Sequence, residues 1–380
     1  MKWRLRMMAV AAAAMACMAG AAGAATIDTL AKQAVLIDMT SGTTLFEKNA
    51  DQRMPTSSMS KVMTGIMVFE RIREGKITLE DTLPVSKKAW QMQGSKMWVD
   101  IGTDVKVEDL LRGMIIQSGN DACIVLAEGL AGSEEAFAKA MTERAHAIGM
   151  KDTNLVNASG WPDDNHYSTA HDLAIMATYL IREFPEHYKY YSEKEYTYHG
   201  IKQGNRNPLL YRGIDVDGVK TGHTDAAGYG LIASAERQGR RLLLVVNGLP
   251  SMQARADESA KLLEWGFREF ETNKLFAKGE AVATAATWYG RDEQVPLVPA
   301  EDVSVTMQRG AKGSISAKVK MMEPIAAPIA AGQQLGTLIV TANDVKPIEV
   351  PLIAGQAVER MGPVARALAG AQYLMKSGLQ

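Results

Sequence analysis

Hydrophobic and polar residues follow two different periods along the first two thirds of the chain. At residues 33–46, two short apolar runs flank a Ser-Gly turn, which predicts a β-hairpin. Apolar residues then recur at helical spacing, beginning with Val62, Ile66 and Phe69. Further helices are predicted at residues 105–116, 121–131, 134–148, 172–184 and 253–270. Strands are predicted at residues 213–224, 229–236 and 241–248. Strands at both ends with helices between them predict an α+β domain whose terminal strands share one sheet.

The pattern changes after residue 277, where short β segments alternate with Gly and Pro. These segments lie at residues 281–287, 303–308, 316–322, 334–340 and 348–352. They predict a small β-sandwich or barrel. The last stretch, residues 361–380, places its apolar side chains on one helical face and has no acidic residue. Such a helix can lie on a membrane surface or dock on the protein, and the pattern alone favours neither.

The N-terminus has the pattern of a secretory signal peptide. Lys2, Arg4 and Arg6 form a basic region, residues 7–18 are apolar, and residues 22–24 are small enough for cleavage. The apolar segment is too short for a comfortable transmembrane helix. We therefore expect export of the protein. The expected organisation is a signal peptide at 1–24, an α+β domain at 25–277, a β-sandwich domain at 278–357 and an amphipathic helix at 358–380.

Composition narrows the possible classes of protein. The length of 380 residues favours two domains, and 42 Lys+Arg against 43 Asp+Glu, with no basic run, argue against a nucleic-acid partner. Of the 2 cysteines, Cys17 falls in the signal peptide, so no intrachain disulfide is expected. Cys123 lies in an apolar helical run and is interpreted as a small buried residue. The 6 histidines show no metal-ligand spacing, so no metal or cofactor is expected.

One short motif pairs a hydroxyl with an amine. The run Ser58-Met59-Ser60-Lys61 places Ser58 and Lys61 one helical turn apart, where they can hydrogen-bond. By itself this signal is weak, because a helix-capping serine followed by a solvated lysine explains it equally well.

Two further motifs strengthen the signal. Ser118-Gly119-Asn120 lies between two predicted helices, where both polar side chains could face one cleft or Asn120 could cap the second helix. Lys220-Thr221-Gly222 lies at a predicted edge strand, where Gly222 would let a substrate backbone approach closely. The alternative for this motif is a charged edge strand that resists pairing with other chains.

Together and in this order, the three motifs are the known set of penicillin-binding proteins and class A β-lactamases. Over nearly its whole length the chain resembles the low-molecular-mass penicillin-binding proteins of type 5/6, the D-alanyl-D-alanine carboxypeptidases of peptidase family S11. The runs that carry this resemblance are residues 117–122, 205–207 and 220–224. The resemblance implies a β-lactamase/transpeptidase-like catalytic domain, a small all-β sandwich domain and a C-terminal amphipathic helix that associates with the membrane.

The resemblance also implies catalytic roles. Ser58 would be the acylated nucleophile and Lys61 its general base, with its pKa lowered by burial and by the like charge of Lys220. Ser118 would relay a proton to the leaving D-alanine. Asn120 would hold the peptide or the base in position, and Lys220 would be catalytic as well, since the chemistry needs both lysines.

Substrate binding is implied for a second set of residues. This set consists of Lys220, Thr221, Gly222, His223 and Arg255. The backbone N–H groups of Ser58 and His223 would form the oxyanion hole, and Thr221 and Arg255 would grip the terminal carboxylate. Asp172 also matches a family position near the site, but it fits a helix-capping box somewhat better.

Three other functions could use the same motifs. A β-lactamase normally has a second base in a Glu-x-x-Leu-Asn loop, and none occurs between Asn120 and Lys220. A D,D-endopeptidase of a related class usually carries a large insertion between the first two motifs. Lys61 and Ser118 are too close in sequence for such an insertion. A non-catalytic envelope module would be expected to have lost one of the catalytic residues.

The resemblance therefore implies a serine-type carboxypeptidase that removes the C-terminal D-alanine from peptidoglycan pentapeptides and is acylated by β-lactams. It also implies a periplasmic enzyme, peripheral on the outer face of the cytoplasmic membrane. The sequence leaves open whether the chain forms a homodimer.

Overall fold

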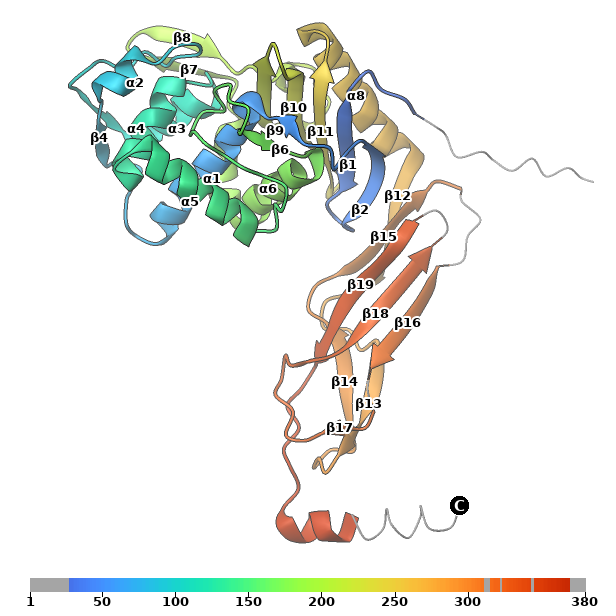
Figure 1. The fold of residues 1–380 in the computed structure, drawn as a ribbon. Helices are drawn as coiled ribbons and strands as arrows, with labels where there is room; N and C mark the ends of the chain where they lie inside the picture. Colours follow the sequence, from blue (N-terminus) through green and yellow to red (C-terminus); the bar gives the residue numbers. More distant parts are fainter. Residues whose placement is uncertain (1–26, 311–314, 322, 343–344, 370–380) are drawn as a thin grey trace, which may run out of the picture.

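A computed structural model of the protein describes residues 27–310, 315–321, 323–342 and 345–369 (Figure 1). The signal peptide expected at 1–24 lies outside these residues. The larger, N-terminal domain is built on one five-stranded antiparallel sheet in the order β2-β1-β11-β10-β9. Its strands are β1 (Gln33–Asp38), β2 (Thr43–Lys48), β9 (Val216–Thr224), β10 (Gly228–Arg237) and β11 (Arg240–Leu249). The predicted sheet that joins the two ends of this region is confirmed.

Both faces of this sheet are covered. Alternate residues of a strand point to opposite faces, so Val35 and Val245 pack against the helical cluster, whereas Leu36 and Leu244 pack against α8 (Met252–Glu269). Burial on both sides explains why β1 and β11 appear in the sequence as continuous apolar runs rather than as alternating ones.

The helices of the cluster gather on one side of the sheet (Figure 1). They are α1 (Lys61–Arg73), α3 (Val107–Ile115), α4 (Asn120–Ala131), α5 (Glu134–Ala147) and α6 (Ala170–Glu183). The sequence pattern missed the shortest elements, because two to five residues are too few to show a period. These are α2 (Lys87–Gln91), α7 (Pro185–Tyr188), β3 (Met54–Pro55), β4 (Thr82–Pro84), β5 (Asp104–Lys106), β6 (Tyr167–Ser168), β7 (Glu195–Tyr198) and β8 (Ile201–Gly204).

The C-terminal domain is the small all-β domain that the sequence predicts. β12 (Phe270–Phe276) continues directly from α8 and pairs with β15 (Val303–Gln308). A second sheet has the order β16-β18-β19-β14-β13-β17. Its strands are β13 (Ala283–Trp288), β14 (Gln294–Pro299), β16 (Ser316–Met321), β17 (Ile325–Ala326), β18 (Gln334–Ala342) and β19 (Val345–Ala354). A separate apolar core fills this domain. The boundary expected at 277 follows β12, although β12 pairs within the β domain.

Asp38, the last residue of β1, forms hydrogen bonds that join the N-terminal domain to the β domain. Its carboxylate is fully buried, and Oδ2 accepts hydrogen bonds from Arg240 Nε at 2.7 Å, Thr272 Oγ1 at 2.8 Å and Thr306 Oγ1 at 2.8 Å. Thr272 belongs to β12 and Thr306 to β15. One buried acid therefore holds the first sheet of the β domain against the catalytic sheet.

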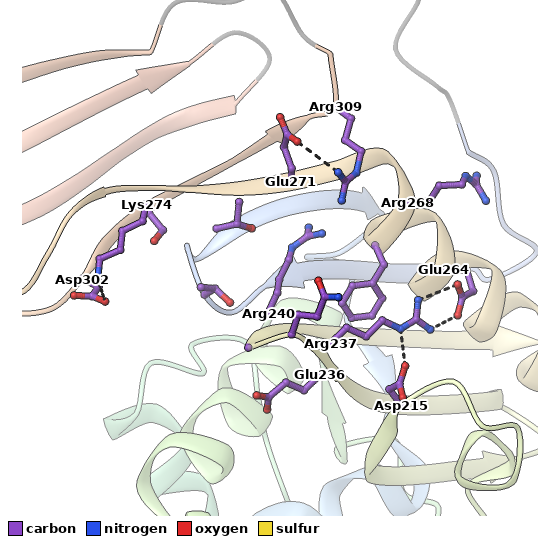
Figure 2. A pocket seen from close by; sticks show the side chains of 16 residues that line it. Asp215, Glu236, Arg237, Arg240, Glu264, Arg268, Glu271, Lys274, Asp302 and Arg309 are labelled. Atoms are coloured by element: carbon purple, nitrogen blue, oxygen red, sulfur yellow. Dashed lines mark hydrogen bonds and ion pairs between the residues drawn. The ribbon is translucent and has the colours of Figure 1, made fainter.

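A cavity opens beside this connection, where the turn between β10 and β11 faces α8, β12 and β15 (Figure 2). Within it, Arg237 is paired with both Asp215 and Glu264, and Arg309 pairs with Glu271. The other cations that line the cavity also have acidic partners. We interpret the cavity as part of the domain junction rather than as a binding site.

A short helix ends the described chain at residues 363–369, beyond the β domain (Figure 1). Its apolar side chains Val364 and Leu368 are 75% and 63% exposed. The remainder of the helix predicted at 361–380 lies outside the described residues. Within the described part of the chain, every helix is too short or too polar to cross a membrane.

Candidate active site

Ser58 lies in the 3-10 helix η1 (Ser57–Ser60), which leads directly into α1. Neither of these two described helices begins with a side-chain cap, so the capping interpretation of Ser58 is wrong. The preceding Ser57 has a φ of 48°, a left-handed value that is unfavourable for a residue with a side chain and is found preferentially at functional sites. Ser58 Oγ accepts a hydrogen bond from Lys61 Nζ at 2.8 Å.

Lys61 is buried among oxygen acceptors. Its Nζ donates to Ser58 Oγ at 2.8 Å, to Asn120 Oδ1 at 2.8 Å and to the backbone carbonyl of Ser159 at 2.5 Å. Burial lowers the pKa of Lys61 to about 8, and the Arg206 guanidinium contributes to the lowering. The amine therefore loses its proton far more readily than an exposed lysine does.

The Ser159 carbonyl is positioned by Asn157, a residue that the sequence analysis did not single out. Asn157 Oδ1 accepts the backbone N–H groups of Ser159, Gly160 and Trp161 at 3.2, 2.8 and 3.0 Å. Its Nδ2 donates to the carbonyl of Trp161 at 3.0 Å. Gly160 has a φ of 77°, and a Cβ there would lie 1.8 Å from the Ser57 carbonyl. The loop can approach η1 this closely only with glycine at that position.

Ser118 and Lys220 form a second hydroxyl–amine pair. Lys220 Nζ, from the edge strand β9, donates to Ser118 Oγ at 3.0 Å and to the Thr221 carbonyl at 3.3 Å. Ser118 has a φ of 61°, again left-handed. Burial, followed by the like charges of Lys61 and Arg206, holds the pKa of Lys220 well below its usual value. Burial is the largest cause of the lowered pKa of both lysines, and the two ammonium charges repel each other across the site.

Asn120 is the first residue of α4, and no side chain caps that helix in the described structure. The capping interpretation of Asn120 is therefore wrong. Its amide oxygen accepts from Lys61, and its Nδ2 donates to the backbone carbonyl of Gln93 at 2.9 Å. The side chain thus connects the buried lysine to the segment that follows α2.

Gly222 allows β9 to approach η1 closely within the protein. A Cβ at this position would lie 2.9 Å from the Thr56 carbonyl and 3.1 Å from Ser57 Cβ and Met59 Cγ. β9 can therefore pack against η1 only because residue 222 has no side chain. This contact sets the distance between the two motifs.

The side chains expected to bind the carboxylate lie beside β9. Arg255, from α8, is 6% exposed; its Nη1 donates to the Gly222 carbonyl at 3.5 Å, and its guanidinium lies 5.6 Å from the ring centre of Tyr229. Burial lowers the pKa of Arg255 to about 10, so the group stays charged at neutral pH. Thr221 is buried, and the exposed His223 ring stacks on Tyr229 at 3.9 Å. Arg255 and Tyr229 therefore both lie next to β9, the strand that carries Lys220 and Thr221.

Arg206 is a second residue for which the sequence analysis gave no role, although it lies in a run shared with the family. Its Nη1 donates to Ser95 Oγ at 2.5 Å, and its charge lowers the pKa of Lys61, Lys220 and Arg255. These four cations come from four separate segments of the chain, so their proximity could not be predicted from local sequence.

Other candidate residues do not belong to the site. Asp172 donates its backbone N–H to the Thr169 cap, and its carboxylate accepts from the backbone N–H of Asp152 and from Thr153 Oγ1, which supports its structural interpretation. Cys123 is fully buried, as expected, and burial raises its pKa to about 12. No group of three or more His, Cys, Asp or Glu among the described residues is arranged to bind a metal.

Comparison with known proteins identifies the family. Residues 19–251 match the peptidase S11 family, described as D-alanyl-D-alanine carboxypeptidase, and residues 270–360 match the C-terminal domain of penicillin-binding protein 5. The D-alanyl-D-alanine carboxypeptidase DacA of Haemophilus influenzae is 40% identical over 315 residues, which cover 81% of this chain and 80% of that protein. DacC of Escherichia coli K12 is 39% identical over 340 residues, which cover 87% and 85%.

Solved structures agree with this result. Penicillin-binding protein 5 from Haemophilus influenzae superposes with a TM-score of 0.83 at 38% identity, over 89% of this chain and all of that one (100%). Penicillin-binding protein D2 from Listeria monocytogenes, in its ampicillin-bound form, superposes with a TM-score of 0.59 at 32% identity, over 64% of this chain and 99% of that one. The chain therefore belongs to the D-alanyl-D-alanine carboxypeptidase family, peptidase family S11, and is a serine-type carboxypeptidase.

Proposed function

We propose that this protein removes the C-terminal D-alanine from peptidoglycan pentapeptides through an acyl-enzyme on Ser58, and that penicillin acylates the same oxygen. The observation that carries the proposal is the set of three oxygens around Lys61 Nζ. A neutral amine has two N–H bonds and one lone pair. The carbonyl oxygens of Asn120 and Ser159 can only accept, so they take the two N–H bonds. The lone pair is then directed at Ser58, whose hydroxyl can donate its proton.

Acylation follows from this arrangement. Ser58 Oγ attacks the carbonyl carbon of the scissile peptide while its proton passes to Lys61 Nζ. The developing oxyanion is placed between the backbone N–H groups of Ser58 and His223, as the family resemblance implies.

Expulsion of D-alanine needs a proton on the leaving nitrogen. Ser118 Oγ accepts from Lys220, so its own hydrogen is free to donate to that nitrogen as the C–N bond breaks. Lys61 holds the proton taken from Ser58 and can restore that of Ser118. Water then attacks the ester and gives a proton to Lys61, which returns a proton to Ser58 Oγ as the ester C–O bond breaks.

Recognition of the terminal carboxylate is assigned to Thr221 and Arg255. Arg255 is charged, buried and adjacent to the Gly222 carbonyl, and a guanidinium suits a carboxylate better than an ammonium does. The requirement for a free terminal carboxylate restricts the enzyme to removal of the last residue.

The test combines a peptide substrate with a labelled inhibitor. Purified enzyme is incubated with diacetyl-Lys-D-Ala-D-Ala and, separately, with a fluorescent penicillin. We expect released D-alanine and a covalently labelled protein, and we expect Ser58→Ala to lose both. D-alanine release by Ser58→Ala would refute the mechanism. Labelling without D-alanine release would indicate a binding protein, and rapid opening of the β-lactam ring without peptide turnover would indicate a β-lactamase.

Location and membrane association are part of the same proposal. The N-terminal pattern supports export to the periplasm, and the exposed apolar residues Val364 and Leu368 support attachment of the C-terminal helix to the outer face of the cytoplasmic membrane. The substrate polymer would then lie on the side of the catalytic domain away from that helix.

A further inference from the structure

Tryptophan side chains are exposed beside the candidate active site. Trp90, Trp98 and Trp161 are 42%, 52% and 41% exposed. Trp90 lies in α2, at the end of the catalytic domain farthest from the β domain (Figure 1), and Trp98 follows that helix in the sequence. Large apolar side chains that remain exposed together usually mark an interaction surface.

Trp98 is held on the surface in an unfavourable conformation. Its φ is 71°, a left-handed value that is rare for a bulky residue. The buried carboxylate of Asp121, in the first turn of α4, accepts the backbone N–H groups of Trp98 and of its neighbours Met97 and Val99, at 2.9, 2.9 and 3.3 Å. A strained backbone persists where surrounding contacts fix it, and such residues cluster at ligand-binding sites. Here the acid adjacent to Asn120 fixes the position of an exposed indole.

The three indoles line three hollows that share lining residues. Trp90 and Trp98 line one hollow together with Gln91 and Gln93. The same two glutamines line a second hollow with Trp161. Trp161 in turn lines a third hollow, which contains Ser57 and Thr224 beside the active site.

Direct contacts connect this path to the catalytic residues. The Gln93 carbonyl accepts from Asn120 Nδ2 at 2.9 Å. At the intervening Gly94, a Cβ would lie 2.9 Å from Asn120 Nδ2 and 3.0 Å from the Trp161 ring. We call the surface formed by Trp90, Gln91, Gln93, Trp98 and Trp161 the tryptophan track.

We propose that the tryptophan track binds the glycan strand of peptidoglycan while the stem peptide of that strand enters at Ser58. This inference rests on the proposed function, because it takes the substrate to be part of that polymer. Indole rings offer flat apolar faces on which the C–H faces of pyranose rings can stack. The side-chain amides of Gln91 and Gln93 lie between the indoles and can hydrogen-bond hydroxyl and acetamido groups.

A neutral saccharide fits this surface better than a crosslinked peptide does. The described residues that line the hollow between the two glutamines and Trp161 include Lys87 and Lys88 and no acidic side chain, so this hollow disfavours the amino group of a diamino acid. Asp100 lies in the hollow at the outer end of the track. A polymer that continues past the reacting peptide needs a surface of this extended form.

The first test measures binding without turnover. Ser58→Ala enzyme, otherwise the full mature chain, is titrated by calorimetry with peptide-free glycan strands of alternating N-acetylglucosamine and N-acetylmuramic acid. We expect saturable binding that weakens roughly tenfold or more when Trp90→Ala and Trp98→Ala are added, as the loss of aromatic contacts predicts. Ile101→Ala is the matched control, because Ile101 is 48% exposed in the same segment but lines none of the three hollows. Absence of binding by the glycan strands, or binding only of sugar-free crosslinked peptides, would overturn the proposal.

The second test compares two substrates with the same scissile bond. In the active enzyme, Trp90→Ala with Trp98→Ala should leave kcat/KM for diacetyl-Lys-D-Ala-D-Ala within about twofold of the parent. It should lower kcat/KM for glycan-attached pentapeptide about tenfold, mainly by raising KM. Equal losses on both substrates would mean that the track acts on the catalytic residues, and would refute glycan binding. Failure to hydrolyse either substrate would refute the proposed function instead, and the titration would still decide the role of the track.

Discussion

The proposed acylation depends on which acceptor each N–H group of Lys61 binds. Lowering the pKa of a lysine from 10.5 to about 8 corresponds to about 3 kcal/mol of destabilised ammonium. Three oxygen acceptors surround the ammonium, and only one of them, Ser58 Oγ, can become a donor when the amine is neutral. The same three contacts therefore hold the Lys61 side chain in place in the resting enzyme and direct the neutral amine to take its proton from Ser58.

The pH dependence of the reaction should follow this group. Because the base must be neutral, kcat/KM for D-alanine release should rise about tenfold per pH unit on the acidic side and level off above an inflection near pH 8. Acylation by fluorescent penicillin, followed by rapid quench, should show the same inflection because it uses the same base. A profile without an inflection between pH 6 and 9 would contradict this role of Lys61.

Asn157 is expected to be a positioning residue that acts through Ser159. Asn157→Ala removes the acceptor for three backbone N–H groups, so the Ser159 carbonyl should withdraw from Lys61. Loss of that acceptor destabilises the ammonium further, since hydrogen bonds to a charged form favour it. The kcat plateau should fall about tenfold or more, and the inflection should move to lower pH.

Two variants make the Asn157 prediction specific. Asn157→Asp keeps an acceptor for the loop and should retain most of the plateau activity. Asn165→Ala changes an exposed residue of the same loop and should leave both quantities unchanged. A lower plateau with an unmoved inflection in Asn157→Ala would mean that Asn157 stabilises the loop without orienting the base.

Among the elements, β9 and η1 determine the site by packing against each other. β9 carries Lys220 and Thr221, and η1 carries Ser58. The edge position of β9 leaves one side of the strand free for a substrate, and Gly222 lets the strand approach η1. The sequence predicted the strand β9 and the helical turn that joins Ser58 to Lys61, but it did not predict the packing of Gly222 against Thr56 and Met59.

Gly222→Ala should separate the two elements. The new Cβ would meet a backbone carbonyl that cannot move aside, so we expect a loss of about 1–3 kcal/mol in the free energy of unfolding. Penicillin acylation should slow more than tenfold, because Lys220 moves with the strand. Gly204→Ala, on β8, is the control, since its Cβ would find no atom closer than 3.4 Å. Unchanged acylation in Gly222→Ala would contradict this account of the strand.

At the scale of the whole molecule, a buried acid joins two domains that have separate cores. Asp38 accepts hydrogen bonds from Arg240, from Thr272 and from Thr306, and the last two belong to the β domain. The elongated arrangement in Figure 1 depends on this junction.

Asp38→Asn should loosen the junction. The amide cannot pair with the Arg240 charge or accept all three donors, and breaking a buried ion pair costs about 3–5 kcal/mol. Thermal unfolding and limited proteolysis around residue 270 should both detect the change. Lys274→Ala breaks an exposed pair with Asp302 at the same junction and should cost at most about 1 kcal/mol. Similar unfolding curves for the two variants would show that Asp38 does not hold the domains together.

The C-terminal helix gives a further prediction at this scale. The boundary expected at 358 falls within the β domain, because Val358 is 1% exposed and pairs with Ile329. Deletion of residues 363–380 should therefore release the enzyme from the membrane fraction with unchanged kcat/KM on the tripeptide. A truncated enzyme that still sediments with membranes would refute attachment through this helix.

The sequence by itself determined the order of the catalytic motifs, the longer strands and helices of the first domain and the change to short β segments after the helical region. These features are local, because strand and helix periods record which side of an element is buried. The pairing of Ser58 with Lys61 is of the same kind, since one helical turn brings the two side chains together.

The tertiary structure alone decided which distant groups complete the site. Ser159 meets Lys61 across 98 residues of sequence, Ser118 meets Lys220 across 102, and Arg206 adds its charge from a third segment. Such contacts depend on how the sheet and helices close around one core, and no local period records them. For the same reason the sequence did not single out Asn157 or Trp98, whose positions are set by hydrogen bonds that form only in the folded chain.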